Sequence, residues 1–189
     1  MTNNLSLEAC IPDVFEALRY PHIQTFAELN RLEYLNIQKG YIWLSRQRKY
    51  SDFLAERFVK ELHKKLFGLV WLSAGEFRHL DASDDSLPRD IEDALVLLLT
   101  ETGDWISANA YNREELAARF FHRLLKIRPF PVGNARFARI MTDVVLEKVM
   151  KVAPIVWDEK VFMGDDGELQ YADVLRYAER LDDQMVMAF

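Results

Sequence analysis

The side chains best suited to bind a ligand are concentrated in residues 128–139. The segment reads Arg128-Pro129-Phe130-Pro131-Val132-Gly133-Asn134-Ala135-Arg136-Phe137-Ala138-Arg139. In a helix, Arg136 and Arg139 lie on neighbouring parts of one face, where both guanidinium groups could contact a single phosphate chain. A helix start at the Gly-Asn pair would add unpaired N–H groups and the positive end of a helix dipole. The segment therefore predicts an anion pocket, and the alternative is a turn between helices with ordinary surface arginines.

Two helices are predicted to position this segment. Asn112 stands three residues before Glu115, which is typical of a helix start, and the helical apolar spacing continues to Ile127. The prolines that follow end this helix, because they cannot donate a backbone hydrogen bond and they disfavour the α conformation of the residue before them. A further helix is predicted over about residues 135–151. The segment is thus expected to form a tight loop between two helices.

The rest of the chain also has mostly helical apolar spacing, so we expect a mainly α fold. One helix is predicted from Phe26, a second after a cap at Ser51, and a last one from Leu169. Residues 91–99 are apolar nearly all round, which is typical of a helix at the centre of a fold. Two short segments are strand candidates, residues 77–80 and 154–157. The acidic residues 81–85 are interpreted as a solvated loop.

Composition restricts the class of protein. The chain has 189 residues, a net charge of −6 and one cysteine. The length fits one domain with an apolar core, and Cys10 excludes both an internal disulfide and a cysteine-based zinc site. No apolar run approaches the roughly 20 residues of a membrane span, and residues 1–8 lack the pattern of a secretory signal. Because the acidity disfavours nucleic acid as a partner, we expect a cytoplasmic globular protein that binds neither membranes nor nucleic acid.

The segment resembles the core motif of the Fic (Fido) family, His-Pro-Phe-x-(Asp/Glu/Asn)-Gly-Asn-Gly-Arg-x-x-Arg. The matching positions are Pro129, Phe130, Gly133, Asn134, Arg136 and Arg139. Residues 61–78 resemble the family's helix that leads to its flap, and the order of these pieces is most similar to the subgroup called mobile mystery protein B. The resemblance implies a Fic-type helical bundle with a small β-hairpin flap. It covers a single domain at residues 25–189, after an N-terminal extension of residues 1–24.

Fic proteins mostly transfer AMP from ATP to a hydroxyl group of a target protein, and the resemblance implies a role for each motif position. The phosphate-binding set here would be Gly133, Asn134, Ala135, Arg136 and Arg139, joined by Arg128. Arg128 stands where the family has its general-base His, and a guanidinium has no acceptor lone pair. Val132 stands where the family has its magnesium ligand, and its side chain offers no oxygen. Ala135 replaces the second Gly, which costs about 1–2 kcal/mol if that position needs a positive φ.

Residues outside the motif could in principle replace the missing groups. His122 is predicted to pack in the core, whereas two histidines near the flap region are candidates for another base, His63 and His79. Many Fic proteins carry an inhibitory Ser/Thr-x-x-x-Glu-Gly/Asn motif, and this chain has no clean match to it. Glu28 and Glu33 are expected to be surface charges, and the alternative is that one of them reaches Arg139.

The missing base and metal ligand lead to one main functional hypothesis and two alternatives. The main hypothesis is a degenerate Fic-fold protein that lacks metal-dependent AMP transfer and binds a protein or an anion. That anion would be ATP or another nucleotide, bound without magnesium. The first alternative is an active nucleotidyl- or phosphotransferase that uses the same pocket by a non-standard mechanism. The second is a structural or interaction protein that binds no ligand.

Overall fold

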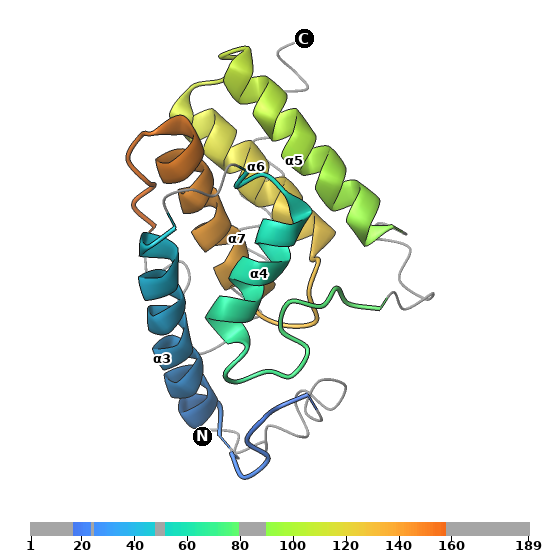
Figure 1. Ribbon diagram of the computed structural model, residues 1–189, viewed down its shortest axis with the longest axis vertical. Helices are drawn as coiled ribbons and strands as arrows, with labels where there is room; N and C mark the ends of the chain where they lie inside the picture. Colours follow the sequence, from blue (N-terminus) through green and yellow to red (C-terminus); the bar gives the residue numbers. More distant parts are fainter. Residues whose placement is uncertain (1–16, 24, 48–51, 80–89, 158–189) are drawn as a thin grey trace, which may run out of the picture.

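The computed structural model describes residues 17–23, 25–47, 52–79 and 90–157. These residues form a bundle of α-helices with one π-helical turn at the end of the last helix (Figure 1). In chain order the elements are α3 (Phe26–Ser45), α4 (Glu56–Phe67), α5 (Ile91–Ser107), α6 (Arg113–Ile127), α7 (Asn134–Val144) and the π-helix η1 (Val145–Met150). The mainly α fold is therefore confirmed.

The helix starts follow from local hydrogen bonds. Asn112 caps α6 as predicted, because its side chain accepts from the N–H of Glu115. Asp90 caps α5 in the same way, and Thr25 forms a capping box with Glu28 at the start of α3. The predicted cap of α4, Ser51, lies outside the described residues. The helix itself begins at Glu56, after an Ala55 N-cap that provides no side-chain hydrogen bond.

The helices pack in sequence-neighbouring pairs. α3 packs along α4, and α6 packs against both α5 and α7 (Figure 1). The prediction that residues 91–99 form a central helix is wrong, because α5 lies at one edge of the bundle and its Val96 and Leu97 are exposed. The inner side of α5 is apolar because it packs on the bundle, where Leu95, Leu98 and Leu99 are buried. α4, α6 and α7 surround the core instead.

The predicted strands are not found in the part of the chain that the structure describes. Residues 154–157 have irregular backbone, and so do residues 77–79, while the rest of the expected β-hairpin flap and the acidic residues 81–85 lie outside the described ranges. An isolated antiparallel bridge joins Leu18 to Trp71. Residues 17–23 therefore lie against the loop after α4, where the Arg19 N–H donates to the Val70 carbonyl (2.9 Å).

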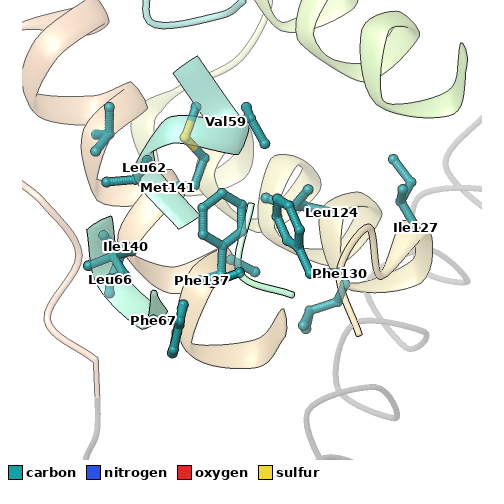
Figure 2. Packing of buried hydrophobic residues seen from close by; sticks show 14 of the residues in the cluster. Val59, Leu62, Leu66, Phe67, Leu124, Ile127, Phe130, Phe137, Ile140 and Met141 are labelled. Atoms are coloured by element: carbon teal, nitrogen blue, oxygen red, sulfur yellow. The ribbon is translucent and has the colours of Figure 1, made fainter. Parts of the chain in front are cut away.

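A dry cluster of side chains fills the space between α4, α6 and α7. Figure 2 shows Phe130 and Phe137 inside it, surrounded by aliphatic residues of these helices. Phe67, Phe130 and Phe137 are each 0% exposed. The connection between α6 and α7 thus contributes Phe130 to the core, while Arg128 at its start is exposed. None of the described helices is both long enough and apolar enough to cross a membrane.

Candidate functional site

Residues 128–133, which we call the motif loop, join α6 to α7 through two residues in the left-handed region. Arg128 ends α6 with φ 46°, and Gly133 precedes α7 with φ 74°. A Cβ atom on Gly133 would lie 2.8 Å from the Phe67 ring, so the position needs glycine for its φ and for its space. The predicted helix start at the Gly-Asn pair is confirmed. Ala135 lies inside α7 with ordinary helical backbone, so its methyl group causes no backbone strain.

The side chain of Asn134 fixes the shape of the loop. Its amide donates to the carbonyl of Phe130 (2.7 Å), and its Oδ1 accepts from the Phe130 N–H (3.0 Å). Both backbone groups of a buried residue are thereby satisfied. The predicted anion-binding role of this side chain is not tested, but both ends of the amide already have protein partners.

His63 of α4 holds the same loop through its ring, which contacts Val132 and Phe130. The Gly75 N–H donates to its Nδ1 (3.0 Å), so the ring proton is on Nε2, which donates to the Val132 carbonyl (3.1 Å). The ring stacks on Phe130 with centroids 3.6 Å apart and is 0% exposed. Burial lowers the pKa of His63 to about 3, so the imidazole is neutral at ordinary pH. Both nitrogens are engaged in joining three segments, and the ring packs as a structural group.

Arg136 is held by the buried carboxylate of Glu33 on α3. Its guanidinium forms an ion pair with Glu33 of α3, and the other Glu33 oxygen accepts from Trp71 Nε1 (2.7 Å). Glu33 is 2% exposed, so the expectation that it is a surface charge is wrong. The carboxylate contacts Arg136 and not Arg139, the partner that the alternative prediction gave it. Glu28, by contrast, is exposed and completes the capping box at Thr25.

Arg139 lies one helical turn further along α7, in a different electrostatic environment. It is half-buried, and its charge acts on Tyr41 of α3 and on Asp143. Both oxygens of Asp143 accept from Trp157 Nε1 (3.0 Å each), which ties residues after η1 to α7. Burial raises the pKa of Asp143 to about 6, against the lowering effect of the Trp157 hydrogen bond. Arg136 thus pairs with Glu33, whereas the charge of Arg139 acts on Tyr41 and Asp143.

Arg128 lies at the open edge of the motif loop. Its side chain is exposed, and its carbonyl accepts from Arg78 Nε (2.7 Å). The Arg78 guanidinium also reaches the Ile127 carbonyl (3.4 Å), and the Arg78 N–H donates to the Pro129 carbonyl (2.9 Å). A cation at the carbonyl end of α6 is favoured by the helix dipole. Arg78 thus fixes the start of the loop and leaves the Arg128 side chain at the surface.

Other predicted residues have packing roles or remain apart from the loop. His122 is buried at 4% exposure, as predicted for a packing residue, whereas His79 is exposed. Val132 packs against the hydrophobic core. Among the described residues, no three His, Cys, Asp or Glu side chains are grouped so that they could hold a metal ion.

Three residues with structural roles were missed or misjudged from the sequence: Glu33, Asn36 and Arg78. Glu33 and Asn36 occupy the same helical face as Leu29 and Ile37, and polar residues on such an apolar face indicate buried partners. That signal was available but gave no information on which partner Glu33 would find. Arg78 had no comparable local signal, because its acceptors lie 49 and 50 residues away.

Comparisons with known proteins show what this chain is similar to. Residues 53–146 match the model of the Fic/DOC family. The N-terminal FIC domain of Bep8, a VirB-translocated effector protein from Bartonella sp. 1-1C, has a similar fold, with a TM-score of 0.61 and 17% sequence identity over 85% of this chain and 88% of that one. The N-terminal Fic domain of a Bep effector from Bartonella sp. AR 15-3 gives a TM-score of 0.57 and 19% identity over 81% and 82% of the two chains.

A third similar structure contains a nucleotide analogue. BepC from Bartonella tribocorum with bound AMPPNP gives a TM-score of 0.56 and 16% identity over 69% of this chain and 72% of that one. No curated protein matches the chain in sequence. The similarity to these structures establishes the fold.

Proposed function

We propose, on the premise that residues 53–146 form a Fic/DOC family domain, that this protein binds a phosphate-bearing anion and does not carry out metal-dependent AMP transfer. The single observation that carries the proposal is the chemistry of the motif loop. Its exposed side chain is the Arg128 cation, and the imidazole that touches the loop, His63, already uses both nitrogens. The site therefore offers positive charge to a ligand without an evident base.

General-base catalysis requires an acceptor lone pair near the reacting hydroxyl group. A guanidinium has none, and it stays protonated at any physiological pH. His63 cannot replace it in this conformation, since Nε2–H donates to Val132 and Nδ1 accepts from Gly75. A missing base typically lowers the rate by 10²–10⁴.

The residues present do not fit magnesium at the position that the resemblance assigns to it. The Val132 side chain is hydrocarbon and packs on the core, and its carbonyl oxygen accepts from His63 Nε2. Magnesium needs several oxygen ligands in near-octahedral geometry. We therefore assign no step to a metal at this site.

The residues do fit an anion at the start of α7. Gly133 provides no side-chain cap, so the first turn of α7 presents backbone N–H groups and the positive end of its dipole. Arg128 and Arg139 add charge from the two ends of the segment, whereas Glu33 neutralises Arg136. BepC, which has a similar fold, has AMPPNP bound, and this supports a phosphate-bearing ligand for this protein.

Binding is tested by calorimetry and thermal unfolding with ATP, ADP, AMP and inorganic pyrophosphate, each with and without magnesium. We expect saturable binding that does not need magnesium and that is weakened about tenfold or more by Arg128→Ala combined with Arg139→Ala. Arg57→Ala, an exposed cation on α4, is the matched control and should leave binding unchanged. If none of these anions binds at millimolar concentration, the protein is a structural or interaction protein and the proposal is wrong.

Activity is tested separately with labelled ATP, magnesium or manganese, and a cell extract as a source of targets. We expect no label transfer by the natural sequence. Transfer that Arg128→Ala abolishes would instead establish an active transferase with a non-standard mechanism. A variant with Arg128→His, Val132→Asn and Ala135→Gly shows whether the fold regains transfer when the family's groups are restored.

A further inference from the structure

The motif loop connects two helix ends of opposite polarity. The carbonyl end of α6 is the negative end of its helix dipole, and the first turn of α7 is the positive end of the next one. An anion at the start of α7 is attracted by the N–H groups there, but free carbonyl groups at the end of α6 repel it. Anion binding by this loop therefore depends on what neutralises the carbonyl end of α6.

Arg78 contacts three consecutive carbonyl groups at that end. Its Nε donates to the Arg128 carbonyl (2.7 Å), its Nη2 reaches the Ile127 carbonyl (3.4 Å), and its backbone N–H donates to the Pro129 carbonyl (2.9 Å). A guanidinium suits this arrangement, because it is always charged and has several N–H groups in one plane. Arg78 therefore brings a positive charge to the negative end of α6 and bonds to carbonyl groups that would otherwise repel an anion.

The same contacts hold Arg128 in an unfavourable backbone conformation. Its φ of 46° and ψ of 62° lie in the left-handed region, where a residue with a Cβ atom is strained. Such a conformation persists only where the surrounding structure fixes it. Arg78 bonds to the carbonyl of this residue and to those on both sides of it, so it fixes the peptide planes that set this φ and ψ. The direction of the exposed Arg128 side chain depends on that backbone conformation.

We propose that Arg78 is the positioning residue of the anion site. It neutralises the carbonyl end of α6 and holds the left-handed turn from which the Arg128 side chain extends. This role rests on the proposed function, since it concerns anion binding. Substitution by lysine separates positioning from charge, because lysine keeps the positive charge but has one nitrogen atom in place of the planar set of donors.

Arg19 supplies a matched control. Its Nε donates to the Gly68 carbonyl (2.8 Å) at the end of α4, and the two residues are 49 positions apart in the sequence, as Arg78 and Ile127 are. Gly68 has an ordinary helical conformation with φ −70°, so this contact holds no left-handed turn. Arg19→Lys thus changes the same kind of hydrogen bond at the end of a different helix.

The first test is calorimetric titration of the full chain with inorganic pyrophosphate. Arg78→Lys should weaken binding about fivefold or more, and Arg78→Met at least as much, whereas Arg19→Lys should leave the affinity unchanged. In a chain that already carries Arg128→Ala, Arg78→Lys should change the affinity less than about twofold, because no Arg128 side chain remains to be positioned. A general disturbance of the loop would instead give the same loss in both chains.

The second test is amide hydrogen exchange, measured by NMR without any anion. The Arg128 N–H donates to the Leu124 carbonyl (3.1 Å), and the Phe130 N–H donates to Asn134 Oδ1 (3.0 Å). Arg78→Lys should speed the exchange of these two amides several-fold and leave the amides of α5 unchanged. If the natural chain binds no pyrophosphate and these amides still exchange faster in Arg78→Lys, the proposed function is wrong and Arg78 only holds the turn.

Three results would overturn the role of Arg78. Pyrophosphate binding by Arg78→Lys that equals binding by the natural chain would show that only the charge at this position matters. An equal loss of affinity with and without Arg128→Ala would show that Arg78 does not act through Arg128. Unchanged exchange of the Arg128 and Phe130 amides in Arg78→Lys would show that other contacts hold the turn.

Discussion

The motif loop is held on two sides by different physical means. On the dry side, His63 stacks on Phe130 and bridges the backbone of Gly75 and Val132. On the charged side, Glu33 pairs with Arg136 and accepts from Trp71. The dry side uses neutral, buried groups whose partners are all within the protein. The charged side contains a guanidinium that is 35% exposed and that an external anion could also attract.

The dry side thus maintains the conformation of the motif loop, whereas the charged side sets the positive charge near it. Substitutions on the dry side remove packing and leave backbone groups unpaired, so they should mainly lower stability. Substitutions on the charged side change how much positive charge the segment offers, so they should mainly change anion affinity. Variants of each side test this distinction. The largest effect on the free energy of unfolding is expected at His63.

His63→Ala should lower the free energy of unfolding by about 3–5 kcal/mol, because it leaves a cavity beside Phe130 and two unpaired backbone groups. Urea unfolding measures the change. His79→Ala is the matched control, since His79 is exposed, and it should change stability by less than about 0.5 kcal/mol. Similar losses for both variants would mean that His63 does not hold the loop.

Acid should destabilise the protein through the same residue. The pKa of His63 is about 3 in the folded chain, against 6.5 for an unperturbed histidine side chain. Below pH 6.5 the unfolded chain therefore binds a proton that the folded chain does not bind. The contribution of His63 to the free energy of unfolding is full above pH 6.5 and falls by about 1.4 kcal/mol per pH unit down to about pH 3.

Asp143 has the opposite effect on the free energy of unfolding between about pH 6 and pH 4. Its pKa is about 6 when folded and 3.8 when unfolded, so protonation between those values favours the folded chain. Urea unfolding at several pH values should therefore show a steeper acid loss in Asp143→Asn between pH 6 and 4. His63→Asn should remove the part of the acid loss that His63 causes between pH 6.5 and about pH 3. Equal pH profiles for the natural and His63→Asn chains would contradict the assignment.

Asn134→Ala should cost about 1–3 kcal/mol of stability, because the buried Phe130 N–H and carbonyl lose their partners. The exposed Asn30 of α3 gives the control, and Asn30→Ala should be close to neutral. Chemical denaturation measures both. If Asn134→Ala instead leaves stability unchanged and abolishes anion binding, Asn134 belongs to the ligand site rather than to the dry side.

Glu33→Gln should have the smallest effect on stability, about 1–2 kcal/mol, because the amide keeps the Trp71 hydrogen bond and Arg136 retains contact with water. It should strengthen pyrophosphate binding several-fold, since a negative charge beside Arg136 is removed. Calorimetry tests the gain, with Glu92→Gln on α5 as an exposed control. Weaker binding in Glu33→Gln would show that the ion pair positions Arg136 for the ligand.

The local signals in the sequence predicted the helices well. Asn112 caps α6, the prolines end it, and α7 begins at Asn134 after a left-handed Gly133. These features depend on a few neighbouring residues, so they can be identified without knowledge of the fold. The position of α5 was predicted wrongly, because an apolar helix can be buried in the centre or exposed at an edge with the same sequence.

The site was predicted less completely. The motif segment and its arginines were identified, but Arg136 and Arg139 were expected to grip one ligand together. That joint role stays a prediction; what the sequence did not reveal is that Arg136 pairs with Glu33 across 103 residues of sequence. His63 was considered as a base because only its residue type was known, and its tautomer depends on Gly75 and Val132.

The sequence by itself determined the helical class, the loop at residues 128–133 and the cations beside it. Helix caps, proline breaks and glycine turns depend on a few neighbouring residues, so they can be predicted from the amino-acid sequence alone. The tertiary structure decided which charges remain available, because buried ion pairs and the burial of His63 depend on residues brought together from distant parts of the chain. The loop has its shape from its own residues, and its chemistry depends on Glu33, His63 and Arg78.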